Sequence, residues 1–197
     1  MNKNILQKIY LEDKLSVTEI AKLLKCSSGR INYWLQKHNI KKRTISEAIY
    51  QKHNPSGDPF KFNVPKSDKR MFLFGLGLGL YWGEGTKRNK HAIRLGNTDP
   101  DLIKSFINFL VSIYNIDKNK LKFQLLSYDD LDQDELISFW TKYLSVKNTQ
   151  FSKTTILKRR GKGTYLERMK YGVLLLTFGN IKLRNLICSQ IANIKNM

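Results

Sequence analysis

Residues 72–87, FLFGLGLGLYWGEGTK, constrain the fold more than any other stretch, because they place five glycines within eleven residues. Glycine destabilises a helix interior by roughly 1 kcal/mol relative to alanine, and it weakens a strand as well. The glycines are Gly75, Gly77, Gly79, Gly83 and Gly85. Whatever structure this segment adopts must therefore use the space left by the missing side chains.

The spacing of these glycines excludes two nucleotide-binding loops. A phosphate-binding loop needs G-x-x-x-x-G-K-[ST], whereas the order after Gly85 is threonine and then lysine. A dinucleotide-binding fingerprint that used Gly77 and Gly79 would need a third glycine where Trp82 stands. A nucleotide-binding loop is therefore not expected in this segment.

Two structures remain open for the segment. In a strand, leucines and glycines would alternate at period two. In a helix, Gly75, Gly79 and Gly83 would recur every four residues and share one face. Such a face lets a second helix approach unusually closely, so a helix–helix contact would make use of the glycines.

Residues 77–85, GLGLYWGEG, resemble the LAGLIDADG motif of homing endonucleases. The matching positions are Gly79, Leu80, Gly83, Glu84 and Gly85. The chain departs from the motif at Trp82, which replaces its first aspartate, and at Gly77, which replaces its opening leucine. The resemblance favours the helix and implies that two motif helices pack together. Only one copy of the motif is present, so a homodimer is expected.

The remaining sequence after the motif is consistent with the fold that the resemblance implies, a saddle-shaped sheet lying on duplex DNA. Strands are predicted at 91–97, 121–128, 151–158 and 171–178, and helices at 102–114, 134–144 and 182–194. Asp99 and Pro100 are a helix cap and a first helical residue. We therefore expect an α+β fold with a LAGLIDADG-type αββαββα-like domain and a mixed or antiparallel saddle sheet.

The first 45 residues predict a trihelical helix-turn-helix domain. An apolar stripe at helical spacing covers residues 4–12, and Ser16 followed by Glu19 is a capping box that starts a second helix. The small Ala21 and the apolar Ile31, ten positions later, are typical of a helix-turn-helix. Lys25 departs from this pattern, because many members have glycine there. A trihelical unit used only for packing is the alternative.

The third predicted helix, capped by Ser27, presents polar side chains that can reach base edges or phosphates. They are Ser28, Arg30, Asn32, Tyr33, Gln36 and Lys37, and a basic arm of Lys41, Lys42 and Arg43 follows. Residues 46–70 contain three prolines and predict a linker, which begins with a short helix at 45–51. The expected domains are thus 1–45 and 71–197, with residues 46–70 between them.

Charge also indicates a polyanionic partner. The formal net charge is +19, and it is concentrated in residues 1–70 and 150–197, which flank a nearly neutral middle. Further candidates for DNA contact are Lys87, Arg88, Lys153, Lys158, Arg159, Arg160 and Lys162. Double-stranded DNA is the expected partner, although basic charge does not distinguish DNA from RNA.

The resemblance implies a chemistry for Glu84. In the resembling enzymes the acid at this place binds a divalent cation over the scissile phosphates, so Glu84 is the expected catalytic residue, with Gly83 beside it as a metal ligand and Mg²⁺ as cofactor. The favoured hypothesis is a homodimeric, site-specific DNA endonuclease, a hydrolase. A non-cleaving transcriptional regulator with the same fold is the main alternative, and an RNA-binding intron-splicing factor is a third.

The two cysteines, Cys26 and Cys188, have no neighbouring Cys or His at metal-ligand spacing, so neither a zinc site nor a disulfide is expected. The apolar run at 71–82 is shorter than the roughly 20 residues that a membrane-spanning helix needs. No membrane association is expected, and the sequence predicts a cytoplasmic protein that is associated with the nucleoid when it binds DNA.

Overall fold

The computed structural model describes residues 1–158 and 170–196. The chain forms two compact units, an N-terminal unit, Met1–Asp58, and a C-terminal unit, Pro59–Met197. The fold is α+β: N-terminal helices precede a four-stranded mixed sheet with further helices. The boundary between the units lies inside the stretch that the sequence predicted as a linker.

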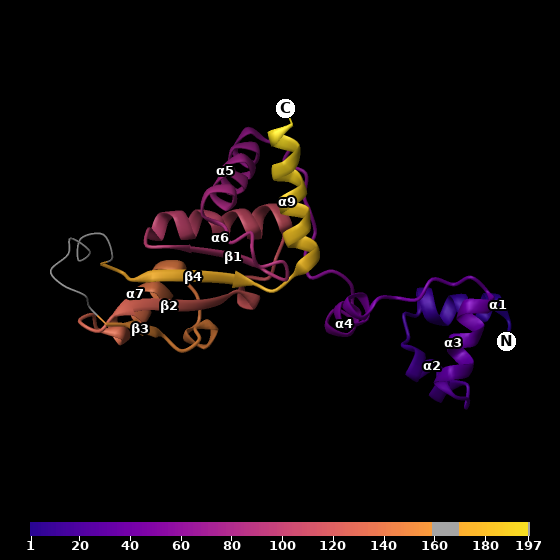
Figure 1. Ribbon diagram of the computed structural model, residues 1–197. Coiled ribbons are helices and arrows are strands. Elements are labelled where there is room, and N and C mark those ends of the chain that lie inside the picture. Colours follow the sequence, from indigo (N-terminus) through magenta and orange to yellow (C-terminus); the bar gives the residue numbers. More distant parts are fainter. Residues whose placement is uncertain (159–169, 197) are drawn as a thin grey trace. The chain divides into compact units, whose positions relative to one another are not determined.

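Helices and strands of both units are labelled in Figure 1. The N-terminal unit contains α1 (Lys3–Gln7), the π-helical turn η1 (Lys8–Glu12), α2 (Val17–Leu23), α3 (Ser28–Lys37) and α4 (Ile45–His53). The C-terminal unit contains α5 (Asp68–Glu84), β1 (Ile93–Asn97), α6 (Pro100–Tyr114), β2 (Lys122–Tyr128), α7 (Gln133–Leu144), β3 (Thr155–Leu157), β4 (Val173–Phe178) and α9 (Ile181–Lys195).

The helices of the N-terminal unit begin where their capping residues predict. Ser16 Oγ accepts a hydrogen bond from the backbone N–H of Glu19 at 3.2 Å, and Glu19 accepts one from the N–H of Ser16 at 2.7 Å. Hydrogen bonding of the Glu19 carboxylate by the side chain and the backbone N–H of Ser16 lowers the pKa of that carboxyl. Ser27 Oγ accepts from the N–H of Arg30 at 3.2 Å and caps α3. The predicted starts of α2 and α3 are confirmed.

The turn between α2 and α3 is tight, although it lacks glycine. Lys25 adopts the left-handed conformation, with φ of 48°. The N–H of Cys26 donates to the carbonyl of Ala21 at 2.9 Å, and the N–H of Lys25 donates to the carbonyl of Lys22 at 3.2 Å. This pair of hydrogen bonds is a Schellman motif, which normally uses glycine. The small core beneath the turn consists of Leu6, Ile9, Tyr10, Ile20, Ala21, Ile31, Leu35 and Ile40.

Lys25→Gly is expected to stabilise the N-terminal unit by about 1 kcal/mol, because a residue with a Cβ loses roughly 1–2 kcal/mol in the left-handed conformation. The matched control is Lys22→Gly inside α2, which should destabilise the unit by about the same amount. Hydrogen exchange of the α2 and α3 amides in the full chain measures both changes. A loss of protection in Lys25→Gly would contradict the expected relief of strain.

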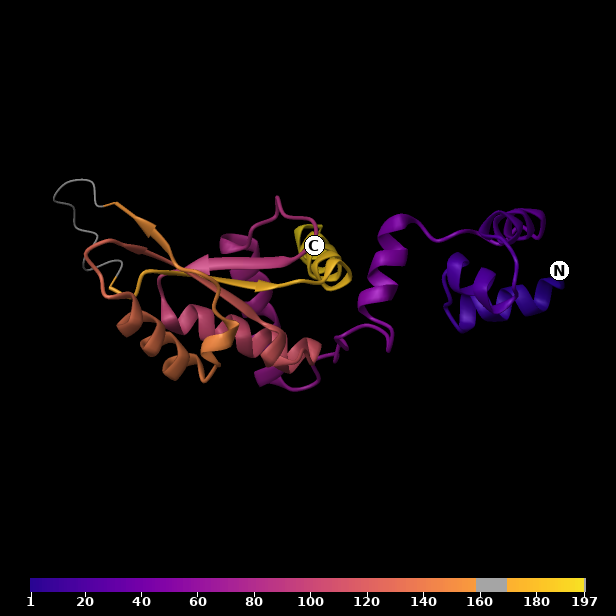
Figure 2. The same cartoon turned by 90° about the horizontal axis from the view of Figure 1, so that it is seen from below.

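The sheet of the C-terminal unit has the strand order β1–β4–β2–β3. β4 is antiparallel to both β1 and β2, and the short β3 is parallel to β2. Alternate residues of β1, β2 and β4 are buried, and they pack with apolar residues of α6 and α7 in one core. Figure 2 shows these two helices on one side of the sheet.

The observed order of elements in the C-terminal unit differs from the expected αββαββα-like order. Only one strand separates α5 from α6, because Gly85 forms just an isolated bridge with Leu95. β3 is shorter than predicted, since the chain at Phe151 forms only a single bridge with Phe123. β4 begins after Gly172, whose φ of 64° interrupts the extended chain.

Part of the predicted linker belongs to the C-terminal unit. Phe60 and Phe62 pack against its core. The N–H of Lys61, between them, donates to the carbonyl of Tyr114 at 2.8 Å, and the N–H of Asn63, which follows Phe62, donates to the carbonyl of Ile113 at 2.8 Å. Apolar burial and backbone pairing thus attach this segment to the end of α6, and α5 then begins at Asp68.

Candidate nucleic-acid interface

The face of α3 that points away from the core carries most of the residues that the sequence predicted to contact DNA. Arg30, Tyr33, Gln36 and Lys37 are exposed, whereas Ser28 and Asn32 are half-buried. The ammonium of Lys37 lies over the ring of Tyr33, 5.7 Å from its centroid. Polar donors and an aromatic ring therefore share one exposed helix face, which suits contact with base edges and phosphates.

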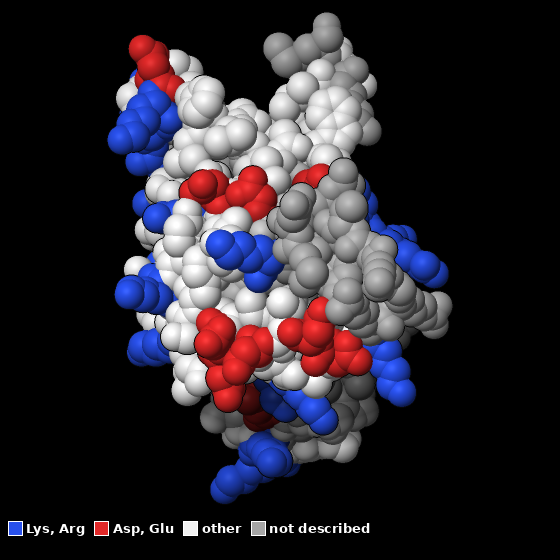
Figure 3. Space-filling view, turned by 90° about the vertical axis from the view of Figure 1, so that its left-hand side faces the viewer, with Lys and Arg blue, Asp and Glu red and all other residues white. Residues whose placement is uncertain are grey.

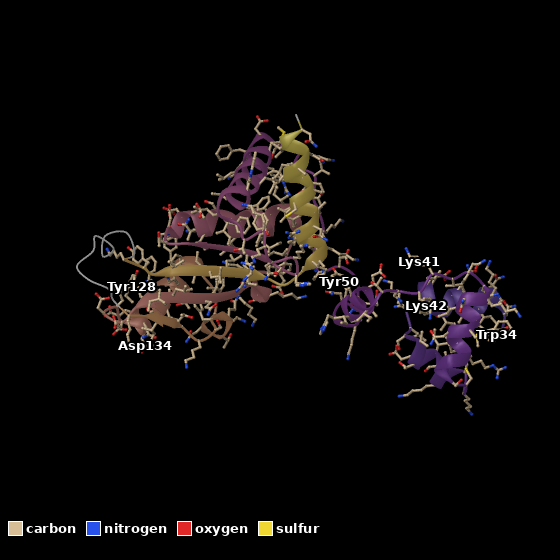
Figure 4. All side chains as sticks on the ribbon, in the orientation of Figure 1. Trp34, Lys41, Lys42, Tyr50, Tyr128 and Asp134 are labelled. Carbon is tan, nitrogen blue, oxygen red and sulfur yellow. The ribbon has the colours of Figure 1, made fainter. Side chains whose placement is uncertain are left out.

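The basic arm after α3 divides into two parts. Lys41 and Lys42 are exposed, and Figure 4 labels both in the segment that follows α3. Arg43 is engaged inside the unit: its guanidinium donates to the carbonyls of Tyr10 at 3.0 Å, Lys14 at 2.9 Å and Leu15 at 2.5 Å. It also lies over the ring of Tyr10, at 4.3 Å. We therefore assign Arg43 to the stability of the unit and leave the lysines as the phosphate-binding candidates.

The glycine-rich segment is a helix, α5, and its glycines divide between two faces. Gly77 is buried, and a Cβ there would overlap the ring of Phe109 on α6. A Cβ at Gly75, Gly79 or Gly83 would meet open space. The same exposed side carries large apolar residues, which are Met71, Phe72, Leu76 and Trp82, and Phe72 is 73% exposed. We call this side, from Met71 to Gly83, the glycine face.

The C-terminal end of α5 brings Glu84 to the edge of the sheet. Glu84 is exposed, and the next residue, Gly85, forms an antiparallel bridge with Leu95 of β1. The N–H of Thr86 donates to the carbonyl of Arg94 at 2.8 Å. These backbone contacts hold the end of α5, and with it the backbone of Glu84, beside the first strand.

Two cations hold the chain just after Glu84. The guanidinium of Arg184, on α9, donates to the carbonyl of Lys87 at 2.7 Å. The ammonium of Lys87 donates to the carbonyl of Trp82 at the end of α5. Lys87 is therefore used in part to cap the helix, in addition to its predicted role at DNA. Beneath them, burial raises the pKa of the Tyr81 hydroxyl.

Oxygen atoms suited to Mg²⁺ are present at this end of α5. Mg²⁺ is bound in proteins by carboxylates and other oxygen ligands, and Glu84 supplies a carboxylate while Gly83 supplies a carbonyl of the last helical turn. Within residues 1–158 and 170–196, no group of three or more His, Cys, Asp or Glu side chains could hold a metal ion. Among the described residues Glu84 belongs to no such group, so the expected site needs a second copy of Glu84.

The other predicted DNA-binding residues are dispersed. Arg88 is exposed in the loop between α5 and β1, and Lys153 and Lys158 are exposed on either side of β3. Arg159, Arg160 and Lys162 lie outside the described residues. Of the described residues in this group, Arg88, Lys153 and Lys158 make no hydrogen bond or ion pair with Glu84.

Two arginines that the sequence interpretation did not single out lie close to the end of α5. The Nε atoms of Arg94 and Arg184 are buried and have no hydrogen-bond partner among the described residues. Arg94 could have been found from its sequence context, because it is the one charged residue of β1 and lies between the apolar Ile93 and Leu95. Nothing in the sequence places Arg184 beside residue 87, since the two are joined only by the tertiary fold.

Comparison with known proteins gives no relative: no family model, no curated protein and no solved structure matches the chain. The similarity of residues 77–85 to the LAGLIDADG motif is therefore a resemblance of sequence alone. In the part of the chain that the structure describes, no helix is both long and apolar enough to cross a membrane.

Proposed function

We propose that the chain is a sequence-specific double-stranded DNA-binding protein that acts as a homodimeric, site-specific endonuclease of the LAGLIDADG type. One observation supports the DNA-binding part: α2 and α3 are joined by a tight turn over a small core of their own, and α3 has an exposed polar face, which we interpret as a helix-turn-helix and its recognition helix. In such units the second helix lies in the major groove and its side chains reach base edges.

The glycine face of α5 supports the homodimer. Gly75, Gly79 and Gly83 leave a path along the helix where the backbone of another helix can come close. The apolar residues beside them, such as Phe72 and Trp82, remain exposed in the single chain. Packing two copies of α5 would remove this surface from water, and a two-fold arrangement would also suit paired half-sites on DNA.

The cleavage part of the proposal depends on Glu84. In a symmetric pair of α5 helices, the Glu84 of each subunit would come to the same end of the pair and hold Mg²⁺ together with the Gly83 carbonyl. Bound Mg²⁺ lowers the pKa of a coordinated water and neutralises charge on the leaving oxygen. The chain's own part is to hold the end of each α5, which carries Glu84, at the sheet edge through the Gly85 bridge and the contact of Arg184 with the Lys87 carbonyl.

A non-cleaving transcriptional regulator is the second candidate, and the independence of the N-terminal unit favours it. The N-terminal unit has a core of its own, distinct from the core of the unit that contains α5. Specific DNA binding can therefore exist without any chemistry at Glu84. The two candidate functions differ in whether the bound DNA is cut.

Selection from a randomised duplex library tests the proposal. Sites recovered with the full-length protein are incubated with Mg²⁺ and examined for strand breaks. Breaks within the recovered sites would support the endonuclease, whereas tight specific binding without breaks in any divalent cation would leave the regulator. A protein that binds only RNA in a parallel selection would contradict both.

Arg30→Ala is expected to weaken discrimination between the selected site and a variant site by about 1–3 kcal/mol. A bidentate arginine contact to guanine contributes about that much binding free energy against the wrong base. Binding measurements on both duplexes give the value. Lys22→Ala is a suitable control, since Lys22 lies exposed on the preceding helix. An equal loss on both duplexes would make Arg30 a phosphate contact instead of a base contact.

A further inference from the structure

Lys42 lies beside Asn32 of α3, although the two residues are ten positions apart in sequence. The ammonium of Lys42 donates a hydrogen bond to Asn32 Oδ1 at 3.2 Å. Asn32 is half-buried, and Lys42 is exposed. We call these two residues the Asn32–Lys42 pair.

The chain turns back at the C-terminal end of α3. Asn39 adopts the left-handed conformation, with φ of 54°. The N–H of Ile40 donates to the carbonyl of Leu35 at 2.8 Å, and the N–H of Asn39 donates to the carbonyl of Gln36 at 3.0 Å. This is a second Schellman motif, and asparagine is one of the residues that tolerate its left-handed position. The segment after α3 therefore reverses toward the helix.

Both sides of Lys42 are anchored in the N-terminal unit. Ile40 is buried in the core of this unit. The N–H of Arg43 donates to the hydroxyl of Tyr10 at 2.8 Å, and the guanidinium of Arg43 donates to three backbone carbonyls. The backbone at Lys42 is therefore held close to α3 from both sides.

The neighbouring Lys41 has a different environment. The Glu47 carboxylate accepts hydrogen bonds from the backbone N–H of Thr44 at 2.6 Å and from its hydroxyl at 3.0 Å. These hydrogen bonds are the main cause of the lowered pKa of Glu47, and the charges of Lys41 and Arg43 lower it further. Lys41 thus lies near a carboxylate, whereas Lys42 is bound to a neutral amide.

Cations without acids in the same stretch of sequence characterise α3 and the segment after it. Residues 28–43 contain five Lys or Arg residues and no Asp or Glu. On the side of the C-terminal unit that Figure 3 shows, by contrast, acidic and basic side chains lie among one another. A polyanion is therefore attracted to α3 without repulsion from a carboxylate of the same segment.

The hydrogen bond from Lys42 determines which groups Asn32 can offer to a base. An ammonium is only a donor, so the amide oxygen of Asn32 must face Lys42. The amide nitrogen of Asn32 has no hydrogen-bond partner among the described residues, so both of its hydrogens remain to be donated. The ammonium of Lys42 has further hydrogens of its own. The pair therefore presents mainly donors, because its oxygen is already engaged.

Donors match one base best in the major groove. Guanine presents two acceptors there, N7 and O6, whereas adenine presents one acceptor, N7, and one donor, its N6 amino group. An asparagine with a free side chain suits adenine, because its oxygen accepts from N6 while its nitrogen donates to N7. When a lysine engages the oxygen, the better match is guanine.

We propose that Asn32 and Lys42 together contact one guanine in the major groove, and that Lys42 determines the preference for guanine over adenine. The inference rests on the proposed DNA-binding function, in which α3 is the recognition helix, and adds the base that this pair selects. Asn32 lies in the first half of α3, the part of a recognition helix that reaches base edges. Lys41 remains a candidate for phosphate contact.

Selection from a randomised duplex library with the full-length protein, followed by sequencing, tests the pair. The wild type should prefer guanine over adenine at one position by about 10-fold or more. Lys42→Met keeps the length of the side chain and removes the ammonium, so the preference at this position should move toward adenine by a similar factor. Asn32→Ala should remove the preference at the same position.

Lys41→Met is the matched control for Lys42→Met. It removes the same charge from the adjacent exposed residue, so it should weaken binding to all sequences equally and leave the selected bases unchanged. Binding constants for the selected duplex and for its guanine-to-adenine variant, measured by fluorescence anisotropy, give the size of each change.

The outcomes separate this inference from the proposed function. If the wild type selects no sequence, the proposed sequence-specific binding fails, and the pair fails with it. If the wild type selects a site but Lys42→Met weakens all sequences equally, as Lys41→Met does, Lys42 is a phosphate contact and only the present inference is wrong. Changes at two different positions in Lys42→Met and Asn32→Ala would also overturn it, because the two residues would then not contact one base.

Discussion

Glu84→Gln is expected to abolish Mg²⁺-dependent cleavage of the recovered site while leaving binding intact. Glutamine has nearly the same shape, but it lacks the charge that holds a hard divalent cation. A bound metal stabilises the transition state by several kcal/mol, so the rate should fall on the order of 10³-fold or more. Single-turnover cleavage at saturating protein measures the rate, and anisotropy measures the affinity.

The matched control for this experiment is Glu135→Gln, which removes the same charge from an exposed position on α7. It should cut like the wild type. If Glu84→Gln cuts equally well, the assignment of Glu84 as the metal ligand is wrong. If the wild type binds specifically and does not cut, the regulator becomes the better account of the chain.

Gly79→Leu is expected to weaken homodimer formation on the order of 10²-fold or more. An inserted side chain that has no room costs about 1–3 kcal/mol, and a symmetric helix pair contains the substitution twice. In the single chain the same leucine meets open space. Its folding stability should therefore hold or rise, because leucine is a better helix former than glycine. Sedimentation equilibrium measures the dimer, and thermal unfolding at low protein concentration measures the monomer.

Gly77→Ala provides the contrast on the same helix. Its Cβ would overlap the ring of Phe109, so this variant should lose about 1–3 kcal/mol of folding stability without any dimer being involved. If Gly79→Leu lowers stability as Gly77→Ala does and leaves the oligomeric state unchanged, the glycine face has no partner helix. A wild-type protein that stays monomeric in the presence of DNA would contradict the proposed homodimer as a whole.

Helix starts were the most predictable part of this fold, because their signals are local. Ser16 with Glu19, Ser27, and Asp99 before Pro100 all cap helices as expected. The strands were less predictable at their ends. β4 begins two residues later than predicted, because Gly172 takes a left-handed conformation that its identity permits but does not require.

In the candidate site, too, some features could be predicted from local sequence and others depend on the tertiary structure. The repeat of Gly75, Gly79 and Gly83 identified one helix face from spacing alone, and these glycines have open space around them. The sequence did not show that Gly77 faces inward. That role depends on Phe109, which α6 brings against α5 only in the folded chain.

The sequence by itself determined the helices of the N-terminal unit, the helical glycine segment and the strong positive charge, because capping, periodicity and composition act over a few residues. Only the tertiary structure determined how the charged side chains are distributed over the C-terminal unit. Lys122 and Arg94 are distant in sequence, and the pairing of β1 and β2 with β4 places them in one row. The same pairing brings the acids that follow β1 and β2 to one side of the sheet, because strands that run in the same direction must end on the same side.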